Sequence, residues 1–166
     1  MKYCVEQAIS QPGEIFRIEG DEVLCDQGEL GEIPVRLQAQ YYYEGNALYL
    51  SGSFETEICA VCARCLTDMR YPMKVDFSEV YKREPDLEEE YPIIENEITL
   101  DPMILDQIFL NLPSRFLCKP DCKGLCPQCG ANLNEGSCAC KDGKESETTT
   151  NPFAKLKGLF DENEEV

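Results

Sequence analysis

The chain has 166 residues, of which 15 are basic, 32 are acidic and eleven are cysteine, and it contains no histidine. This length allows one domain with a modest core and a small second element. The formal net charge of −17 opposes tight binding to nucleic acid phosphates, which requires clustered lysine and arginine.

The compartment follows from two further features. No run of about 20 apolar residues, the length of a membrane helix, occurs, and the N-terminus lacks a signal-peptide pattern. We therefore expect a cytoplasmic protein with no membrane partner. Thiols stay reduced in that compartment, so clustered cysteines are expected to bind metal rather than form disulfides.

Short strands are predicted over the first hundred residues. Residues 14–19 alternate in polarity, and 33–43 with 47–58 form the clearest hairpin, joined by a turn at Gly45 and Asn46. In the second of these runs, one face carries Leu48, Leu50, Gly52, Phe54, Thr56 and Ile58. A further strand is predicted over 69–81, with Tyr71, Met73, Val75 and Phe77 inward and Pro72 at an edge or bulge.

Residues 83–97 carry many carboxylates and predict a solvated loop. The helix that follows is predicted over 101–112, with Asp101 as N-cap, Pro102 in the first turn and an apolar stripe from Ile104 to Leu112. Its apolar stripe predicts that this one helix covers the sheet. The predicted fold class is α+β, mainly antiparallel strands with one covering helix and a small zinc-bound C-terminal appendage.

Composition changes after Pro113 and divides the chain into three parts. Residues 1–115 form the β-rich core, 116–141 a cysteine-rich zinc knuckle, and 142–166 a polar linker with an amphipathic tail. The tail places Phe153, Leu156, Leu159 and Phe160 on one helical face. It is too short for a stable isolated helix, so we expect it to dock on the core or on a partner.

The clearest metal-ligand pattern is Cys126-Pro-Gln-Cys129-Gly, followed by Cys138 and Cys140. Two residues between thiolates allow both sulfurs to reach one ion, and the glycine permits the turn behind them. Four thiolates form a closed tetrahedral set, which indicates a structural rather than a catalytic zinc site.

Cys62 and Cys65 form a second pair with the same spacing, and Cys118 with Cys122 could complete it in space. A competing interpretation groups Cys118, Cys122, Cys126 and Cys129 around one ion and lets the other pairs share a second. Spacing favours the first grouping but does not decide between them. Either way, two zinc ions are expected.

An iron–sulfur cluster is the less favoured alternative. Cys59, Cys62 and Cys65 repeat the C-x₂-C-x₂-C run of such clusters, but the cysteine–proline step that usually follows is absent. Cys4 and Cys25 are isolated and are expected to be small buried hydrophobes. We find no pattern typical of a nucleophile with a histidine base or of a phosphate-binding loop, and no small-molecule substrate is indicated.

Four segments resemble a known family, the YceD-like large-ribosomal-RNA-subunit accumulation proteins. They are Cys62-Ala-Arg-Cys65-Leu66, residues 98–113 (ITLDPMILDQIFLNLP), the run from Cys122 to Asn134, and Asn151-Pro-Phe-Ala-Lys-Leu156. The resemblance implies a role in synthesis, processing or stability of large-subunit ribosomal RNA, with no described enzymatic activity.

The leading hypothesis is a non-enzymatic ribosome-biogenesis factor. Its acidic surface suits a basic protein or ribonucleoprotein better than naked RNA. Candidate partner contacts are Arg64, Phe153, Leu156 and Phe160. The three apolar residues could instead dock on the core, and Arg64 could instead support the thiolates beside it.

Two alternatives remain open. A direct RNA-binding protein could use Tyr41, Tyr42, Tyr43 and Tyr49 for stacking, although such tyrosines more often pack within a sheet. A thiol- or metal-responsive switch could use Cys59, Cys4 or Cys25 and would respond to oxidation.

Overall fold

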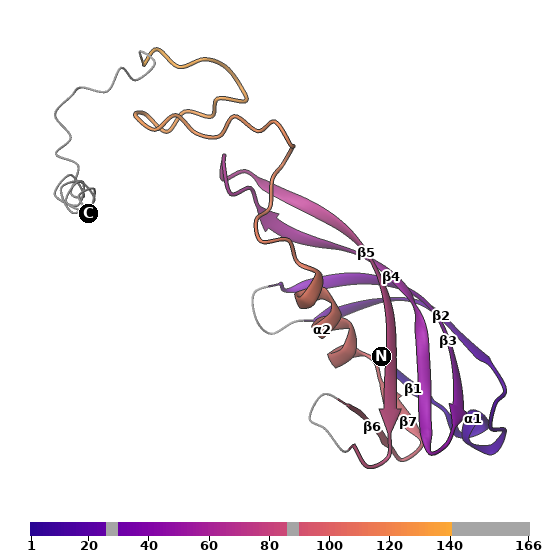
Figure 1. The fold of residues 1–166 in the computed structure, drawn as a ribbon. Helices are drawn as coiled ribbons and strands as arrows, with labels where there is room; N and C mark the ends of the chain where they lie inside the picture. Colours follow the sequence, from indigo (N-terminus) through magenta and orange to yellow (C-terminus); the bar gives the residue numbers. More distant parts are fainter. Residues whose placement is uncertain (26–29, 86–89, 141–166) are drawn as a thin grey trace, which may run out of the picture. The chain divides into compact units, whose positions relative to one another are not determined.

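The computed structural model describes residues 1–25, 30–85 and 90–140, which fall into two compact units (Figure 1). The first unit is Met1–Cys122, and the second begins at Lys123. The elements of the first unit are β1 (Lys2–Cys4), α1 (Glu6–Ser10), β2 (Phe16–Cys25), β3 (Glu32–Glu44), β4 (Ala47–Val61), β5 (Asp68–Lys82), β6 (Tyr91–Ile94), β7 (Glu97–Thr99) and α2 (Asp101–Asn111).

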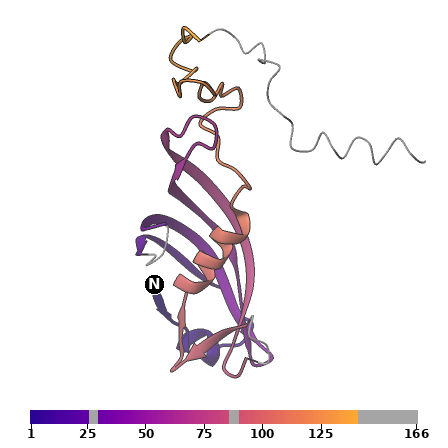
Figure 2. The same ribbon diagram turned by 90° about the vertical axis from the view of Figure 1, so that its left-hand side faces the viewer.

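The seven strands form one sheet in the order β1-β7-β6-β5-β4-β3-β2. Neighbouring strands are antiparallel except β5 and β6, which pair in parallel through Tyr81 and Lys82. The predicted predominance of antiparallel strands is therefore confirmed. The sheet curls, and α2 lies across its inner face (Figures 1 and 2).

The predicted hairpin of β3 and β4 is confirmed. Gly45 and Asn46 both have positive φ, 58° and 73°, which is the geometry of the two-residue turns that match strand twist. Tyr42 pairs with Tyr49 across the hairpin, and their rings stack at 5.1 Å between centroids. Leu48, Leu50, Phe54, Thr56 and Ile58 are buried as the alternation predicts.

Strand β5 also follows its prediction, because Met73, Val75 and Phe77 are buried. Pro72 faces Glu57 of β4, and on the other side β5 pairs with β6 only at its final two residues. Pro72 therefore lies on an open edge within the described part of the sheet, where the missing N–H leaves no ladder bond unmade.

The helices differ from the prediction in two ways. Residues 1–25, 30–85 and 90–140 contain a second helix, because the short α1 packs Ala8 into the core beside Val5. Asp101 does not cap α2: Leu100 is the N-cap residue, and the Asp101 carboxylate instead forms an ion pair with the amino group of Met1. The stripe itself is confirmed at Ile104 and Ile108, which are fully buried.

Residues 83–97 were predicted to be a solvated loop, and this is wrong for their last part. Residues 91–94 form β6, and its Ile93 is 5% exposed and packs in the core. This strand was not predicted because it is only four residues long and follows a run of acidic residues. Positive φ at Glu95 and Asn96 then makes the tight turn into β7.

No helix in the described ranges is long and apolar enough to cross a membrane.

Candidate metal centres

Two groups of four cysteines bring their sulfur atoms together, with all sulfurs of a group within 4.8 Å of one another. One is Cys62, Cys65, Cys118 and Cys122, in the first unit, and the other is Cys126, Cys129, Cys138 and Cys140, in the second. We call them the first and second thiol groups. This is the grouping that spacing favoured over its competitor. All eleven cysteines are free of disulfides.

The first thiol group is built on the loop between β4 and β5. The amide of Cys62 donates to the carbonyl oxygen of Thr67 (3.0 Å), and the amide of Leu66 donates to the carbonyl oxygen of Cys62 (2.9 Å). Closing this loop places Leu66 at a φ of 56°, in the left-handed region. The turn directs the side chains of Cys62 and Cys65 to the same place.

The chain returns to this loop after α2. The amide of Ala63 donates to the carbonyl oxygen of Phe116 (2.9 Å), and the Phe116 ring packs edge-on against Tyr71 of β5. These contacts carry Cys118 and Cys122 to the loop across more than fifty residues of sequence. The Arg64 guanidinium adds a further tie, because its Nη1 donates to the carbonyl oxygen of Cys122 (2.8 Å).

The sulfur distances fit a tetrahedral ion. Sγ of Cys62 is 3.8 Å from Sγ of Cys122, and Sγ of Cys65 is 3.6 Å from Sγ of Cys118. Metal–sulfur bonds of about 2.3 Å in a tetrahedron place the sulfurs roughly 3.8 Å apart. In a disulfide the two sulfur atoms would lie about 2.05 Å apart. The residues present therefore fit a four-thiolate metal centre.

The thiols of the first group differ in acidity. Backbone amides of Cys118 and Cys65 donate toward Cys62 and lower the pKa of its thiol to about 6. Loss of water around the sulfur, and hydrogen bonds to the thiols of Cys122 and Cys65, raise the pKa of Cys118 to about 12. One ligand is therefore already a thiolate at neutral pH, and another must lose its proton when a cation binds.

The second thiol group repeats this architecture. The amide of Cys126 donates to the carbonyl oxygen of Ala131 (2.8 Å), and the amide of Gly130 donates to the carbonyl oxygen of Cys126 (2.9 Å). The donor and acceptor spacings equal those of the first loop, and Gly130 occupies the left-handed position with a φ of 72°. Two loops of the same form thus present two thiols each.

The thiols of the second group also differ from one another in pKa. Amides of Cys129 and Gln128 lower the pKa of the Cys126 thiol to about 6. Hydrogen bonding to the Cys129 thiol, followed by loss of water, raises the pKa of Cys140 to about 12. Hydrogen bonding to the Cys126 thiol raises the pKa of Cys138.

Hydrogen bonds that involve asparagine side chains stabilise the second loop. These residues were not identified from the sequence. Asn134 accepts from the amide of Lys123 (3.0 Å), and Asn132 accepts from the amide and the side chain of Asn134. The amide of Leu133 donates to the carbonyl oxygen of Gly124 (2.9 Å). The Asn-Leu-Asn run was the available signal, because asparagine readily bonds to nearby backbone.

The other residues singled out from the sequence are the remaining three cysteines and the apolar residues of the tail. Cys4 and Cys25 were expected to be buried, and this is wrong: both are exposed, because they occupy outward positions at strand ends. Cys59 is exposed on β4 opposite Arg70, so the C-x₂-C-x₂-C run does not converge on one site. Phe153, Leu156 and Phe160 lie outside the described residues.

Tyrosines proposed for RNA stacking are engaged within the sheet. Tyr41 is 7% exposed and stacks on Phe16, with 5.5 Å between ring centroids. Tyr42 and Tyr49 stack on each other, and the Tyr43 hydroxyl donates to Asn46. These contacts agree with the packing interpretation.

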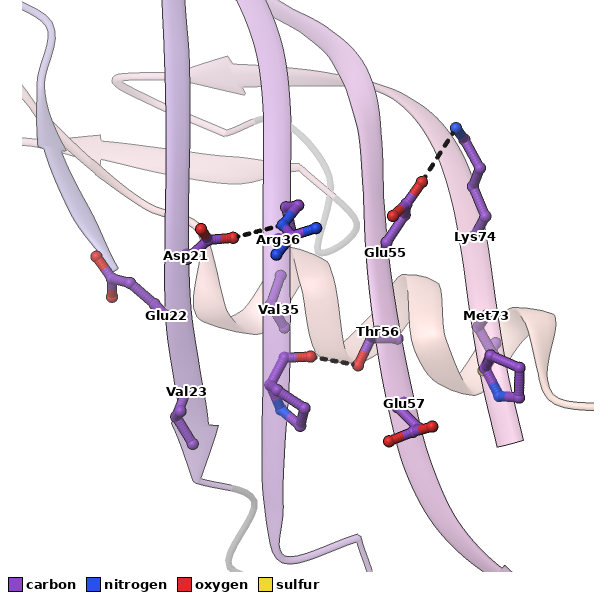
Figure 3. A pocket seen from close by; sticks show the side chains of 12 residues that line it. Asp21, Glu22, Val23, Val35, Arg36, Glu55, Thr56, Glu57, Met73 and Lys74 are labelled. Atoms are coloured by element: carbon purple, nitrogen blue, oxygen red, sulfur yellow. Dashed lines mark hydrogen bonds and ion pairs between the residues drawn. The ribbon is translucent and has the colours of Figure 1, made fainter. Parts of the chain in front are cut away.

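A groove of about 720 Å³ lies over the outer face of β2 to β5 (Figure 3). Two ion pairs form among its lining side chains, Arg36 with Asp21 at 2.9 Å and Lys74 with Glu55 at 3.3 Å. Val23, Pro34 and Pro72 line the adjoining part. The groove has no thiol in its lining, and the thiol groups remain the candidate site.

A pH dependence follows from the raised pKa of Cys118. We expect the zinc affinity of the first group to rise about tenfold or more per pH unit around neutrality, because this thiol loses one proton for each ion bound. Cys62 adds nothing to the slope above its pKa of about 6. Competition with a chromophoric chelator at several pH values measures the slope; an affinity independent of pH would show that the thiols do not bind as thiolates.

Leu66 offers a test of loop strain. A non-glycine residue in the left-handed region is destabilised by about 1–2 kcal/mol, and the Leu66 side chain is 64% exposed and gains little from packing. Replacing Leu66 by Gly is therefore expected to leave stability unchanged or raise it by up to about 1 kcal/mol. Urea unfolding measures this, with Val61→Ala as a neighbouring apolar truncation. A loss above about 1 kcal/mol would show that Leu66 packs more than its exposure indicates.

Comparison with known proteins gives relatives over the region that holds both thiol groups. The family model described as Large ribosomal RNA subunit accumulation protein YceD matches residues 50–160. An uncharacterized protein of Mycobacterium tuberculosis is 29% identical over 147 residues, which are 84% of this chain and 67% of that one. The comparison with solved structures found no significant match.

Two plant proteins match a shorter part. The chloroplastic Large ribosomal RNA subunit accumulation protein YCED homolog 1 of Zea mays is 39% identical over 71 residues, 42% of this chain and 22% of that one. Its Arabidopsis thaliana counterpart is 31% identical over 74 residues, 45% and 23% of the two chains. Because the family model covers more than half of the sequence, the chain belongs to the YceD family of large ribosomal RNA subunit accumulation proteins.

Proposed function

We propose that this chain is a ribosome-biogenesis factor that supports synthesis, processing or stability of large-subunit ribosomal RNA. The family match over residues 50–160 carries the proposal, and it includes every cysteine of both thiol groups. The plant relatives, whose names state large ribosomal RNA subunit accumulation, support the same role.

The metal we propose is zinc, with one ion in each thiol group. Four thiolates at tetrahedral spacing suit zinc, and a closed set leaves no position for a substrate. The role is therefore structural: the ion in the first group ties the β4–β5 loop to the chain after α2. Elemental analysis of protein purified under reducing, anaerobic conditions is expected to give about two zinc ions per chain. Iron with visible absorbance would instead favour the cluster alternative.

The factor acts by binding and not by catalysis, in this proposal. An excess of 32 acidic over 15 basic residues favours a basic protein or a ribonucleoprotein as partner. Arg64, Phe153, Leu156 and Phe160 stay our candidate contacts. The cytoplasm is the proposed compartment, since it keeps thiols reduced for metal binding.

The cellular test measures ribosomal RNA after depletion of the protein. We expect mature large-subunit RNA to fall relative to small-subunit RNA, and the wild-type chain to restore the ratio. A matched pair of variants separates the thiol groups from the exposed thiols: Cys62→Ser with Cys65→Ser should fail to restore it, and Cys4→Ser with Cys25→Ser should succeed. An unchanged ratio after depletion would refute the proposed function.

A further inference from the structure

The side of α2 that faces away from the sheet is apolar. A helix that covers one face of a sheet normally carries polar side chains on its outer side, and a helix that is apolar all round is normally buried. After Asp101, the only charged side chain of α2 is that of Asp106. Met103, Ile104 and Ile108 already fill the side that packs in the core. The other large apolar side chains of the helix therefore lie on its outer side.

Four side chains form this surface, which we call the α2 outer face: Leu105, Phe109, Leu110 and Leu112. Leu105, Phe109 and Leu112 follow one another at the spacing of a single helix side, and Leu110 follows Phe109 directly. Phe109 is 50% exposed and Leu110 is 78% exposed, whereas Leu105 and Leu112 are partly buried. Figure 2 shows α2 on the near side of the sheet. In the described part of the chain, no other two consecutive large apolar residues are both exposed.

Acidic groups flank the α2 outer face. Residues 84–114 contain nine acidic residues and neither lysine nor arginine. Asp106 is exposed on α2, and its carboxylate accepts a hydrogen bond from the neutral hydroxyl of Tyr91 (2.8 Å). Glu79 of β5 accepts from the side-chain amide of Gln107 (2.7 Å) and so lies beside the helix. No lysine or arginine of the described residues pairs with either carboxylate, so their negative charge is not neutralised.

The basic residues that follow α2 do not offset this charge. Arg115 and Lys119 come after Pro113, close in sequence to Cys118 of the first thiol group. The four thiolates of that group exceed the positive charge of one zinc ion, so the excess falls on the neighbouring cations first. The α2 outer face thus combines exposed apolar area with net negative charge.

Charge distinguishes between the possible occupants of this face. A second copy of the chain would bring a further net charge of −17, and RNA would bring phosphates, so both are repelled. Residues 151–166 of this chain are apolar in part, but they contain two basic and four acidic residues. A segment with apolar side chains and an excess of lysine or arginine is favoured twice, because it buries the exposed leucine and phenylalanine and complements the flanking carboxylates.

We propose that the α2 outer face binds a basic amphipathic segment of a protein partner. Phe109 and Leu110 pack against the apolar side of this segment, and Asp106 pairs with one of its lysine or arginine side chains. Recognition of an amphipathic segment by an apolar face with charged flanks is a common mode of peptide binding. The inference rests on the proposed function, in which the partner is a basic protein, and it assigns the surface that this partner contacts.

Full-length zinc-loaded protein and a labelled peptide test the binding by fluorescence anisotropy. The peptide has about 14 residues, roughly four helical turns, with leucines along one helix side and lysines elsewhere. F109Q/L110Q should bind it at least tenfold more weakly than wild type, because two exposed apolar side chains lose their burial. I15Q/V23Q removes two apolar side chains of similar exposure elsewhere on the first unit and should stay within twofold of wild type. D106N should bind more weakly by about threefold and depend less on salt.

Controls separate this binding from unspecific attraction and from loss of structure. Peptides with serine in place of leucine, or glutamate in place of lysine, should bind at least tenfold more weakly. Zinc content and the unfolding midpoint of F109Q/L110Q should match wild type, since both side chains are exposed. Equal peptide affinity of F109Q/L110Q and wild type, or no binding by wild type, would overturn the proposal.

Two other occupants would be recognised directly. Light scattering should show a monomer, and a dimer that F109Q/L110Q dissociates would assign the face to a second copy and overturn the proposal. A tenfold gain in peptide affinity of F153S/L156S would assign the face to the tail of this chain, with the same consequence.

The ribosomal RNA ratio after depletion separates this inference from the proposed function. F109Q/L110Q should fail to restore the ratio, and I15Q/V23Q should restore it. If depletion lowers the ratio and F109Q/L110Q restores it, the α2 outer face is not the contact and the proposed function stands. An unchanged ratio after depletion refutes the proposed function, and with it the role of the partner that this inference assigns.

Discussion

Removal of metal by a chelator is expected to unfold residues 123–140 and to leave the β-sheet folded. In this part of the second unit only Gly124 and Cys126 are buried, so it has almost no apolar core of its own. Zinc binding to comparable small sites supplies on the order of 10 kcal/mol or more, and that energy is the folding energy of such a unit. The sheet instead has a large core of buried side chains from the strands and both helices.

Hydrogen exchange read out by mass spectrometry measures both parts in one sample. Peptides from residues 123–140 should lose their protection after chelation, and those from 33–58 should keep theirs. Cys126→Ser should reproduce the local loss in the presence of zinc, whereas Cys25→Ser, at an exposed position, should not. Protection of 123–140 that survives chelation would show that the asparagine hydrogen bonds suffice without an ion.

Gly52→Ala is expected to destabilise the first unit by about 3 kcal/mol or more. A Cβ at this position would lie 2.3 Å from the carbonyl oxygen of Gln38 and 2.6 Å from Cα of Ala39. Both are backbone atoms of β3, so the clash cannot be relieved by a side-chain rotation, and the strands must separate.

A second glycine provides the matched control. A Cβ at Gly20 would lie 3.1 Å from the Tyr3 hydroxyl, the far end of a side chain that can move, so Gly20→Ala should change stability by less than about 1 kcal/mol. Urea unfolding of both variants measures the difference. If Gly52→Ala unfolds within about 1 kcal/mol of wild type, β3 and β4 are not as close at this point as the structure has them.

Periodicity identified the long strands but not the short elements. The β3–β4 hairpin follows from alternating side chains and a Gly-Asn turn, which are local properties of the sequence. Strands β1, β6 and β7 have three or four residues each, too few for a period to emerge. Strands β6 and β7 place Ile93 and Ile98 in the core, and β1 forms by pairing with β7, so tertiary contacts establish all three.

Capping and burial also depended on tertiary partners. Asp101 has the residue type of an N-cap, but Leu100 takes that position and the Asp101 carboxylate pairs with the Met1 amino group. Cys4 and Cys25 belong to a residue type that is usually buried, yet each lies at an outward position of its strand. Residue type supplies a preference, and the fold decides whether it is met.

By itself, the sequence determined the two Cys-x-x-Cys loops, since their turns close through hydrogen bonds only four or five residues apart. It also determined the family resemblance, which the family match over residues 50–160 confirms. Only the tertiary structure decided that Cys118 and Cys122 join Cys62 and Cys65, because Phe116 docks on Ala63 and Tyr71 after α2. Bringing cysteines together from distant parts of the sequence depends on the direction that the chain takes after α2. No local sequence pattern encodes that direction.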